Sequence, residues 1–392
     1  MTDEIFRRDG YAFEFEAEVV YSEGDIVELD TTAFYPGGGG QVCDTGTIRG
    51  IPVTETFYRG GNIFHRVTGN NLKKGDRVWC SVDWNRRYEL MKGHTGEHLL
   101  FCALKRQDPE LTITKISIAD DDNSVIVDHD PGWENIGRAL EFANQAIRDN
   151  LPVTRSTMSR DDPDLAKVRI KLDRISEDEE ISVVSIGDID VSACSGIHVM
   201  ETSELEMIFV DRKVSAGKDG TAIHFKVGRK AVDSAIRLAS VSLQASDEAG
   251  SKPEDLVRWI SNTKHDLEIG KNAAKALVKD RLHDLSPSNV NGTDIFSGIF
   301  PAADRTVFAD AAESFRRNGG IAVLLSVGDT LSVILSSGRP GTDCKAILGK
   351  VLSEFGGRGG GKHDFAQGGV PDTGCAEAVL SRLIDEVTLS LN

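Results

Sequence analysis

Two short segments of the sequence carry side chains that can bind a metal ion. The segment KGHTGEHLL contains His94 and His98, and the segment SACSGIHV contains Cys194 and His198. In each segment the two ligands stand at i and i+4, which places both on one face of a helix or tight turn. Imidazole and thiolate ligands suit Zn²⁺ better than Mg²⁺ or Ca²⁺. We therefore predict that the two segments form one zinc site, whereas either pair alone is more often structural.

A helix and the end of a strand must position these ligands. Apolar residues recur at helical spacing from Arg86 to about Leu104, so His94 and His98 are expected on a helix. Cys194 and His198 follow the β-branched segment SVVSIGDIDV, which is typical of a strand. The two ligand pairs must therefore meet across a helix and a sheet.

The composition is that of a globular protein. The chain has 392 residues, of which 40% are hydrophobic and 27% charged, enough for several domains with cores of their own. The 6 cysteines lack paired spacing and no apolar segment starts the chain, which indicates a reducing cytoplasm. The longest apolar stretch, 321–336, is interrupted by Gly328 and Asp329, so it predicts two strands around a turn and no membrane contact.

Charge restricts how nucleic acid could bind. The 45 basic and 62 acidic residues give a net charge of −17, which argues against a broad nonspecific nucleic-acid surface. The segment GGRGGGKHDFAQGG, 356–369, is a local exception with Arg358 and Lys362 among glycines. The backbone N–H groups of Gly359, Gly360 and Gly361 could hold phosphate oxygens, so an RNA backbone is expected here. The alternative is a tight glycine turn with solvated charges.

A second glycine-rich segment, LDTTAFYPGGGGQVCDTG, spans 29–46. Four consecutive glycines permit positive φ and close approach by another chain or a ligand. Thr32 and Gln41 flank them beside aromatic residues, which a flexible linker does not need. No Walker lysine follows, so a nucleotide-binding P-loop is not expected.

The order of predicted elements gives an α+β fold. Short alternating strands over 11–84 predict a small β-barrel, and strands over 111–129, 181–191 and 204–227 surround a helix at 133–149. Near the end, strands at 321–327 and 331–336 precede helices near 342–355 and 374–391. The predicted domains are a glycine-motif β-barrel (1–86), an α/β domain with the zinc site (87–228), a helical hairpin (229–285) and a C-terminal α/β domain (286–392).

The helical hairpin is expected from two helical patterns. One runs from Arg229 to Gln244 and ends at Gly250, and the other starts at Pro253 and continues to about His283. A dimerisation element, which would make a homodimer through the hairpin and the C-terminal domain, and a simple spacer both explain this pattern.

Together, in this order, four segments resemble AlaX-type alanyl-tRNA editing proteins of the long form, which are relatives of the alanyl-tRNA synthetase editing domain. FYPGGGGQ is similar to the family's glycine-rich barrel motif, HTGEHLL to its H-x-x-x-H helix and CSGIHV to its C-x-x-x-H half-site. GGRGGGKHDFAQGG is similar to the glycine motif of the DHH-associated C-terminal domain. The resemblance covers nearly the whole chain, and nothing like the class II aminoacylation core precedes the barrel. We therefore expect the protein to hydrolyse tRNA that another enzyme has charged, without charging tRNA itself.

This resemblance implies a substrate and a cofactor. His94, His98, Cys194 and His198 would bind Zn²⁺, and the substrate would be tRNA(Ala) mischarged with serine, with glycine as a second candidate. Thr32 matches a threonine that senses the serine hydroxyl, and Gln41 lies on the same wall. Alanine lacks that hydroxyl, so a pocket that hydrogen-bonds it spares correctly charged tRNA. The resemblance also makes 87–228 the editing domain and 286–392 a tRNA-binding domain.

The sequence departs from the family pattern at two places. Ser195 and Ile197 replace a glycine and a threonine of the second half-site, which can change the amino acid removed. Glu97 makes the first half-site H-x-x-E-H, which also matches inverzincin peptidases, where the glutamate is a general base. Those enzymes use a further carboxylate ligand and no C-x-x-x-H, so we rank them below editing.

The main hypothesis is hydrolysis of the ester at the tRNA 3′ end, with zinc polarising the water or the substrate amino group and with Thr32, Gln41 and Glu97 as candidate catalytic-site residues. Four protein ligands fill a tetrahedral zinc site, whereas a catalytic zinc usually keeps one position open. For catalysis, one ligand must therefore leave, the coordination number must increase, or the water must be held beside the metal. Two alternatives stay open: a tRNA-binding or assembly protein with a structural zinc, and a zinc hydrolase of another acylated substrate.

Overall fold

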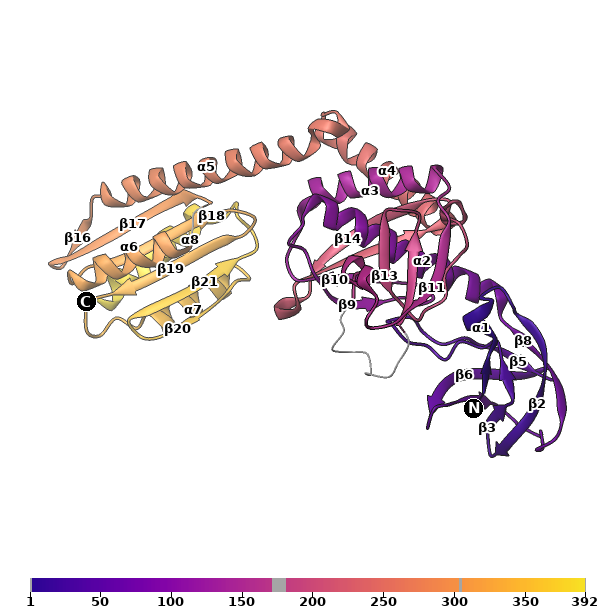
Figure 1. The fold of residues 1–392 in the computed structure, drawn as a ribbon. Coiled ribbons are helices and arrows are strands. Elements are labelled where there is room, and N and C mark those ends of the chain that lie inside the picture. Colours follow the sequence, from indigo (N-terminus) through magenta and orange to yellow (C-terminus); the bar gives the residue numbers. More distant parts are fainter. Residues whose placement is uncertain (1, 171–180, 303–304, 392) are drawn as a thin grey trace. The chain divides into compact units, whose positions relative to one another are not determined.

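The computed structural model describes residues 2–170, 181–302 and 305–391 and contains two compact units, Met1–Ala245 and Ser246–Asn392 (Figure 1). Both units mix helices with sheets, so the predicted α+β class is confirmed. Each unit has its own apolar core.

Six N-terminal strands pair in a closed order, β2-β3-β7-β6-β5-β8. Exposed and buried residues alternate along β2, so Phe15, Ala17 and Val19 face the barrel interior. The bounds are β2 (Glu14–Glu23), β3 (Ile26–Leu29), β5 (Gly46–Ile48), β6 (Ile51–Arg59), β7 (Asn62–Val67) and β8 (Arg77–Val82). Beside them lie β1 (Asp3–Glu4), α1 (Ile5–Arg8) and β4 (Thr31–Thr32).

Helix α2 (Trp84–Gln107) is the central element of the first unit and is buried over most of its length. It begins at Asp83, whose carboxylate accepts a hydrogen bond from the Arg86 backbone N–H. Gly96 allows close packing on the sheet, since a Cβ there would lie 2.7 Å from Val227 Cγ1. The helix predicted for His94 and His98 is therefore present and sits within the core.

Two sheets and α3 (Gly132–Arg148) complete the first unit. One sheet has the order β14 (Ile208–Ser215), β15 (Thr221–Val227), β10 (Asn123–Val127) and β9 (Ile113–Ser117). The other has the order β11 (Val153–Met158), β12 (Ile181–Ile186) and β13 (Asp190–Ala193). The sequence analysis missed β11, which carries polar residues on both faces. Short 3-10 turns lie at Pro163–Lys167, Thr202–Leu205 and Gly217–Asp219.

A buried ion pair joins α2 to the barrel. Arg87 donates from Nε to Asp44 Oδ1 at 2.9 Å, and both side chains are at most 1% exposed. Arg87 also donates to the Ala33 carbonyl at 2.6 Å, and Asp44 accepts from the Tyr35 N–H at 2.6 Å. Because a buried charge left without its partner is strongly destabilising, this pair fixes the glycine-rich loop against the ligand-bearing helix.

The two predicted linker helices are α4 (Gly228–Ala249) and α5 (Leu256–His283), with a 3-10 turn at Pro253–Asp255 between them. Gly250 has a φ of +62° and lies where α4 ends, as expected for a helix C-terminus. Within α5 only Val278 and Leu282 are buried, against α6. The hairpin pairing of α4 with α5 stays a prediction.

The second unit is a six-stranded sheet between two helical layers (Figure 1). β18 is buried on both faces because α5 and α6 pack on one side and α7 and α8 on the other. The strand order is β16 (Ser288–Val290), β17 (Thr293–Pro301), β18 (Ile321–Val327), β19 (Leu331–Ser337), β21 (Phe365–Val370) and β20 (Arg358–Gly361). The helices are α6 (Arg305–Arg317), α7 (Cys344–Glu354) and α8 (Ala376–Ser390).

Among the described residues, no helix combines the length and the apolar character that a membrane-spanning helix needs.

Candidate metal centre

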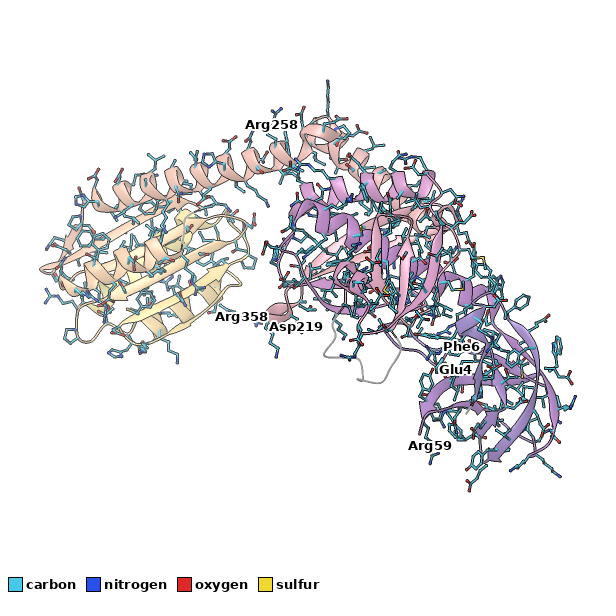
Figure 2. The ribbon with its side chains drawn as sticks, in the orientation of Figure 1. Glu4, Phe6, Arg59, Asp219, Arg258 and Arg358 are labelled. Carbon is cyan, nitrogen blue, oxygen red and sulfur yellow. The ribbon has the colours of Figure 1, made fainter. Side chains whose placement is uncertain are left out.

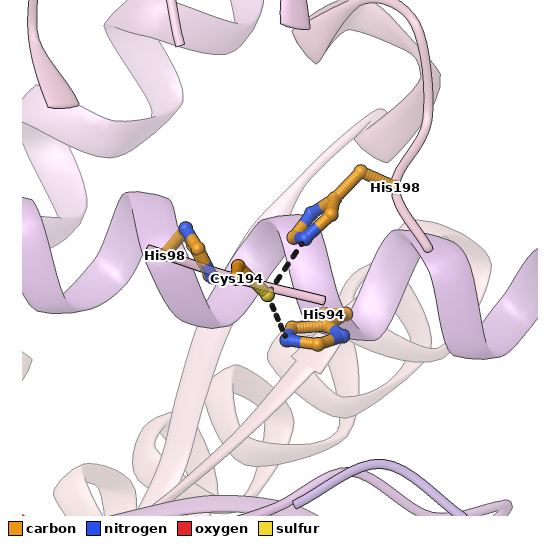
Figure 3. A group of neighbouring side chains, drawn as sticks. All are labelled: His94, His98, Cys194 and His198. Carbon is orange, nitrogen blue, oxygen red and sulfur yellow. Dashed lines mark hydrogen bonds between the residues drawn. The ribbon is translucent and has the colours of Figure 1, made fainter. Parts of the chain in front are cut away.

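The four predicted ligands converge at one place in the first unit (Figure 3). His94 and His98 come from α2, Cys194 follows β13, and His198 lies four residues further along the chain. Their candidate ligand atoms all lie within 4.8 Å of one another. His94 and His98 are buried, Cys194 and His198 are partly exposed as whole residues, and all four ligand groups of the cluster are buried.

The spacing of the donor atoms fits a tetrahedral zinc ion. Cys194 Sγ lies 3.4 Å from His94 Nε2 and 3.4 Å from His198 Nε2. Zinc–nitrogen and zinc–sulfur bond lengths place tetrahedral ligand atoms about 3.3–3.8 Å apart. Three imidazole nitrogens and one thiolate are also a donor set that zinc prefers. The donor set therefore fits zinc in its chemistry, and the two spacings from Cys194 Sγ fit a tetrahedral ion, while the four ligand atoms together lie within 4.8 Å of one another.

Neighbouring residues orient two of the imidazoles. Gln41 Oε1 accepts a hydrogen bond from His94 Nδ1 at 2.7 Å, which leaves His94 Nε2 free to bind a metal. Thr95 Oγ1 donates to the Met91 carbonyl at 3.0 Å, so it accepts from His198 Nδ1 at 3.1 Å. Each ring therefore presents Nε2 to the group, in the tautomer that a metal ligand requires.

The third imidazole faces a carboxylate. His98 Nδ1 lies 3.5 Å from Asp190 Oδ2, and Ser192 Oγ donates to the same oxygen at 2.7 Å. Arg169 contacts that oxygen at 3.2 Å. A carboxylate behind a ligating histidine fixes the ring and raises its basicity. All three histidines thus have a polar group on the side away from the cluster.

The electrostatics of the cluster favour a cation. Burial opposes charge on Cys194, but His94, His198 and His98 hold the pKa of its thiol well below the usual range. The Gly196 N–H also donates to Cys194 Sγ at 3.3 Å. Burial and repulsion from His94 lower the pKa of His198 to about 3, so this ring is neutral. Burial lowers the pKa of His98, but Cys194 and Asp190 raise it to about 10, so this ring would lose a proton when a metal binds. The cluster therefore holds a thiolate and, at His198, a neutral imidazole, which are forms that bind metals.

Gly196 is required by the position of His94. A Cβ on Gly196 would lie 2.0 Å from His94 Cε1 and 2.4 Å from His94 Nδ1. The central glycine of the C-x-G-x-H segment therefore lets the second ligand segment pass directly over the first. Ser195 is exposed, whereas Ile197 is buried beside Gly10.

The glycine-rich segment 29–46 also lies against His94. Gly37, Gly38, Gly39 and Gly40 all have φ between +58° and +146°. The Ile118 N–H donates to the Gly40 carbonyl at 2.8 Å, and a Cβ on Gly40 would lie 2.7 Å from the Ile116 carbonyl. The close approach predicted for these glycines is therefore made to the end of β9, and it places Gln41 on His94.

Three residues were predicted to act beside the metal, and they lie in different surroundings. Gln41 contacts His94, and its Nε2 is buried with no hydrogen-bond partner among the described residues. Glu97 is fully buried, both its oxygens lack a described partner, and Oε2 lies 3.9 Å from His98 Nε2. Thr32 Oγ1 contacts His65 Nε2 at 2.9 Å and accepts from the Phe34 N–H at 3.1 Å. The Thr32 hydroxyl is thus engaged within the barrel.

The basic glycine segment of the second unit is an edge strand. Gly359, Gly360 and Gly361 pair with β21, and a Cβ on Gly361 would lie 2.4 Å from the Phe365 carbonyl. The glycines therefore permit close strand packing, and only the N–H groups on the outer edge face away from the ladder. Arg358 and Lys362 are exposed, and Figure 2 labels Arg358 on this unit.

A cavity of about 540 Å³ lies beside this strand. Gly360 and Gly361 line it together with Arg305 and Gln367, and Arg305 Nε donates to Gln367 Oε1 at 3.2 Å. The cavity extends from the edge strand to β18, β19 and α6, and neither Arg358 nor Lys362 lines it.

Sequence reasoning missed Thr95, Asp190 and Gly196. Thr95 and Gly196 stand inside the two ligand segments, so their positions were a usable signal. Asp190 lies in the predicted strand before Cys194, but its contact with His98 depends on how that strand crosses α2, which spacing does not reveal.

Three family models match separate parts of the chain. The family model for the threonyl and alanyl tRNA synthetase second additional domain matches residues 181–220. The model for class II (A) tRNA synthetases matches residues 8–86, and the DHHA1 domain model matches residues 297–389. Three separate stretches of the chain are thus similar to domain models of tRNA synthetases and to the DHHA1 domain.

Individual relatives are more specific. The alanyl-tRNA editing protein AlaX-L of Pyrococcus horikoshii is 29% identical over 94% of this chain and 95% of its own length. The alanine–tRNA ligase of Methanoregula boonei is 28% identical over 97% of this chain, which spans only 41% of that enzyme. The C-Ala domain of Aquifex aeolicus alanyl-tRNA synthetase aligns with 27% of this chain and 98% of its own, at 20% identity and a TM-score of 0.24. The predicted resemblance to AlaX-type alanyl-tRNA editing proteins is confirmed.

Proposed function

We propose that this protein is an aminoacyl-tRNA ester hydrolase that removes serine, and glycine as a second substrate, from mischarged tRNA(Ala) at a zinc site. The observation that carries the proposal is the cluster of His94, His98, Cys194 and His198. Similarity to AlaX-L over nearly the full length of both chains supports the same activity. The cluster supplies the chemistry and the relative suggests the substrate class.

When bound, a zinc ion would supply Lewis-acid polarisation next to the ester. The chain itself supplies a buried donor, Gln41 Nε2, which lacks a described partner although Gln41 Oε1 is fixed by His94. It also supplies the buried Glu97 carboxylate, which can accept a proton from an attacking water. Both groups border the cluster, so we assign Gln41 to substrate orientation and Glu97 to proton transfer.

Selection against alanine requires a group that hydrogen-bonds the serine hydroxyl. Gln41 Nε2 is available for this bond, whereas the Thr32 hydroxyl already contacts His65 and the Phe34 N–H. The Thr32 hydroxyl then has one lone pair left to accept a further hydrogen bond, and the residue is fully buried. We therefore propose Gln41 as the main selective residue, with Thr32 shaping the wall behind it.

A structural zinc is the second candidate, because four protein ligands are typical of closed zinc sites. The protein would then be a tRNA-binding or assembly factor without hydrolytic activity. Chelation separates the two: removal of a structural ion should unfold the first unit, whereas removal of a catalytic ion should abolish turnover with modest loss of structure.

A deacylation assay tests the proposed function directly. Seryl-, glycyl- and alanyl-tRNA(Ala) are incubated with the protein, with and without a zinc chelator. We expect fast release of serine, slower release of glycine, little release of alanine, and loss of all release after chelation. Absence of serine release by the zinc-loaded protein would contradict the proposal, and equal release of serine and alanine would contradict its selectivity.

The C-terminal unit is our candidate for binding the tRNA body, through Arg358 and Lys362. Replacing both with Gln should raise the KM for tRNA by about tenfold and flatten its logarithmic salt dependence by about two, because each phosphate contact contributes about one. The matched control is Lys350→Gln, since Lys350 is already paired with Glu386 at 2.8 Å. Unchanged KM and salt dependence in the double variant would remove both residues from the interface.

Homodimerisation remains part of the proposal. Apolar side chains of α5 are exposed, among them Val257 at 77%, Leu277 at 66% and Leu267 at 57%. Exposed apolar side chains on a helix are typical of a surface that packs against another chain. We also propose a cytoplasmic location, since tRNA editing takes place in the cytoplasm.

A further inference from the structure

A small cleft of about 110 Å³ lies beside the metal cluster in the first unit. His198, Ile197 and Met200 line one part of it, Arg155 on β11 lines another, and Arg7 and Gly10 of the N-terminal segment lie opposite. The cleft therefore reaches a predicted metal ligand from the side on which Cys194 and His198 are partly exposed.

Arg155 is an unusual cation at this position. It is half-buried, and its guanidinium donates to the Gly196 carbonyl, between Cys194 and His198. Burial lowers the pKa of Arg155, nearby Cys194 opposes that effect, and Arg7 adds to it. An arginine nevertheless stays charged and has five N–H donors, so it needs further acceptors.

The other arginines near the cleft already have partners. Arg7 pairs with Glu4, and Arg8 pairs with Asp3. Over residues 2–170, 181–302 and 305–391, no carboxylate is paired with Arg155. The Cys194 thiolate acts on Arg155, but a bound metal would offset its charge, so an anion that enters the cleft would stabilise this partly buried cation.

We propose that Arg155 binds the phosphate that precedes the 3′-terminal ribose of the substrate, while the ester on that ribose lies at the metal cluster. This inference rests on the proposed function. A planar guanidinium matches two phosphate oxygens at once. In a chain of net charge −17, such a cation also gives the anionic RNA end a specific place to bind beside the cluster.

The test compares two esters that differ in the phosphate. One is seryl-tRNA(Ala), and the other is the seryl ester of adenosine, which has no phosphate. In Arg155→Gln, the KM for seryl-tRNA should rise about 10- to 100-fold, as expected for loss of a charged hydrogen bond. Hydrolysis of seryl-adenosine and the zinc content should change less than twofold. Arg155→Lys should recover part of the affinity, because it keeps the charge without the planar pair of donors.

Arg66→Gln is the matched control, since Arg66 is exposed, is paired with Glu55 and lies outside the lining of the cleft. An equal loss of hydrolysis of both esters in Arg155→Gln, or a loss of bound zinc, would overturn the proposal. Arg155 would then only hold the Gly196 carbonyl in place.

If the wild-type protein hydrolyses neither ester, the proposed function fails, and a binding measurement tests the role of Arg155. The trinucleotide CCA should then bind the wild type more tightly than Arg155→Gln, and equal binding would overturn the phosphate contact.

Discussion

Serine release from mischarged tRNA should fall by at least about 100-fold in Cys194→Ala, because loss of a residue that merely orients a ligand already lowers metal affinity or activity about 10- to 100-fold. Cys194 is the sulfur ligand, and it lies 3.4 Å from each of His94 Nε2 and His198 Nε2. Its removal leaves three imidazoles without the negative charge that stabilises a divalent cation among them. The measurement is kcat/KM on seryl-tRNA(Ala), with bound zinc determined on the same samples. His98→Ala should give a loss of the same kind.

Cys375→Ala is the control for this variant. Cys375 is a free, half-buried cysteine of the second unit, outside the cluster. It should retain wild-type turnover and zinc. Circular dichroism should show that Cys194→Ala keeps its secondary structure. Wild-type turnover by a folded Cys194→Ala protein would refute a catalytic role for the cluster.

Gly196→Ala should abolish zinc binding although it changes no ligand. The added Cβ would overlap the His94 ring, at 2.0 Å from Cε1, so His94 or the segment from Cys194 to His198 must move. A metal site tolerates displacement of only a few tenths of an ångström in its ligands. We expect at least about a 100-fold loss of zinc affinity, more than the loss of an orienting residue would cause. Zinc titration with a competing chelator measures this affinity.

Gly137→Ala is the matched control. Gly137 is exposed on α3 in the same unit, and a Cβ there would meet nothing within 4 Å. This substitution should leave zinc affinity unchanged and should stabilise the helix by up to about 1 kcal/mol. Wild-type zinc affinity in Gly196→Ala would show that the two ligand segments do not pass as closely as the structure has them.

The sequence was sufficient to place the central helix of the first unit. The helix that carries His94 and His98 was expected over 86–104 and is found over Trp84–Gln107, and it is buried on most sides and not along one apolar stripe. Strand β11 was missed because Thr154, Arg155 and Ser156 lack an alternating apolar pattern, and its pairing with β12 is a tertiary contact. Strand β20 was missed for the same reason, since its glycines carry no side-chain pattern.

For the candidate site, too, the sequence predicts local features but not those that depend on tertiary contacts. Ligand identity could be read from His94, His98, Cys194 and His198, because residue type and spacing are properties of the sequence. The contacts that orient these ligands could not, since Asp190 and Gln41 reach them only through the crossing of β13 over α2 and the docking of the glycine loop. From the sequence, the glycines of 356–369 were explained either by phosphate binding or by a tight turn with solvated charges. The Cβ distances give another reason for them, which is close packing of neighbouring strands.

X-ray absorption at the zinc edge, with metal analysis of the purified protein, tests the central claim most directly. We predict one zinc per chain, coordinated by one sulfur at about 2.3 Å and three nitrogens at about 2.0–2.1 Å, with the sulfur lost in Cys194→Ala. A protein that contains no zinc after exposure to the metal, or a zinc whose coordination is unchanged in Cys194→Ala, would contradict the claim that these two segments bind one ion together.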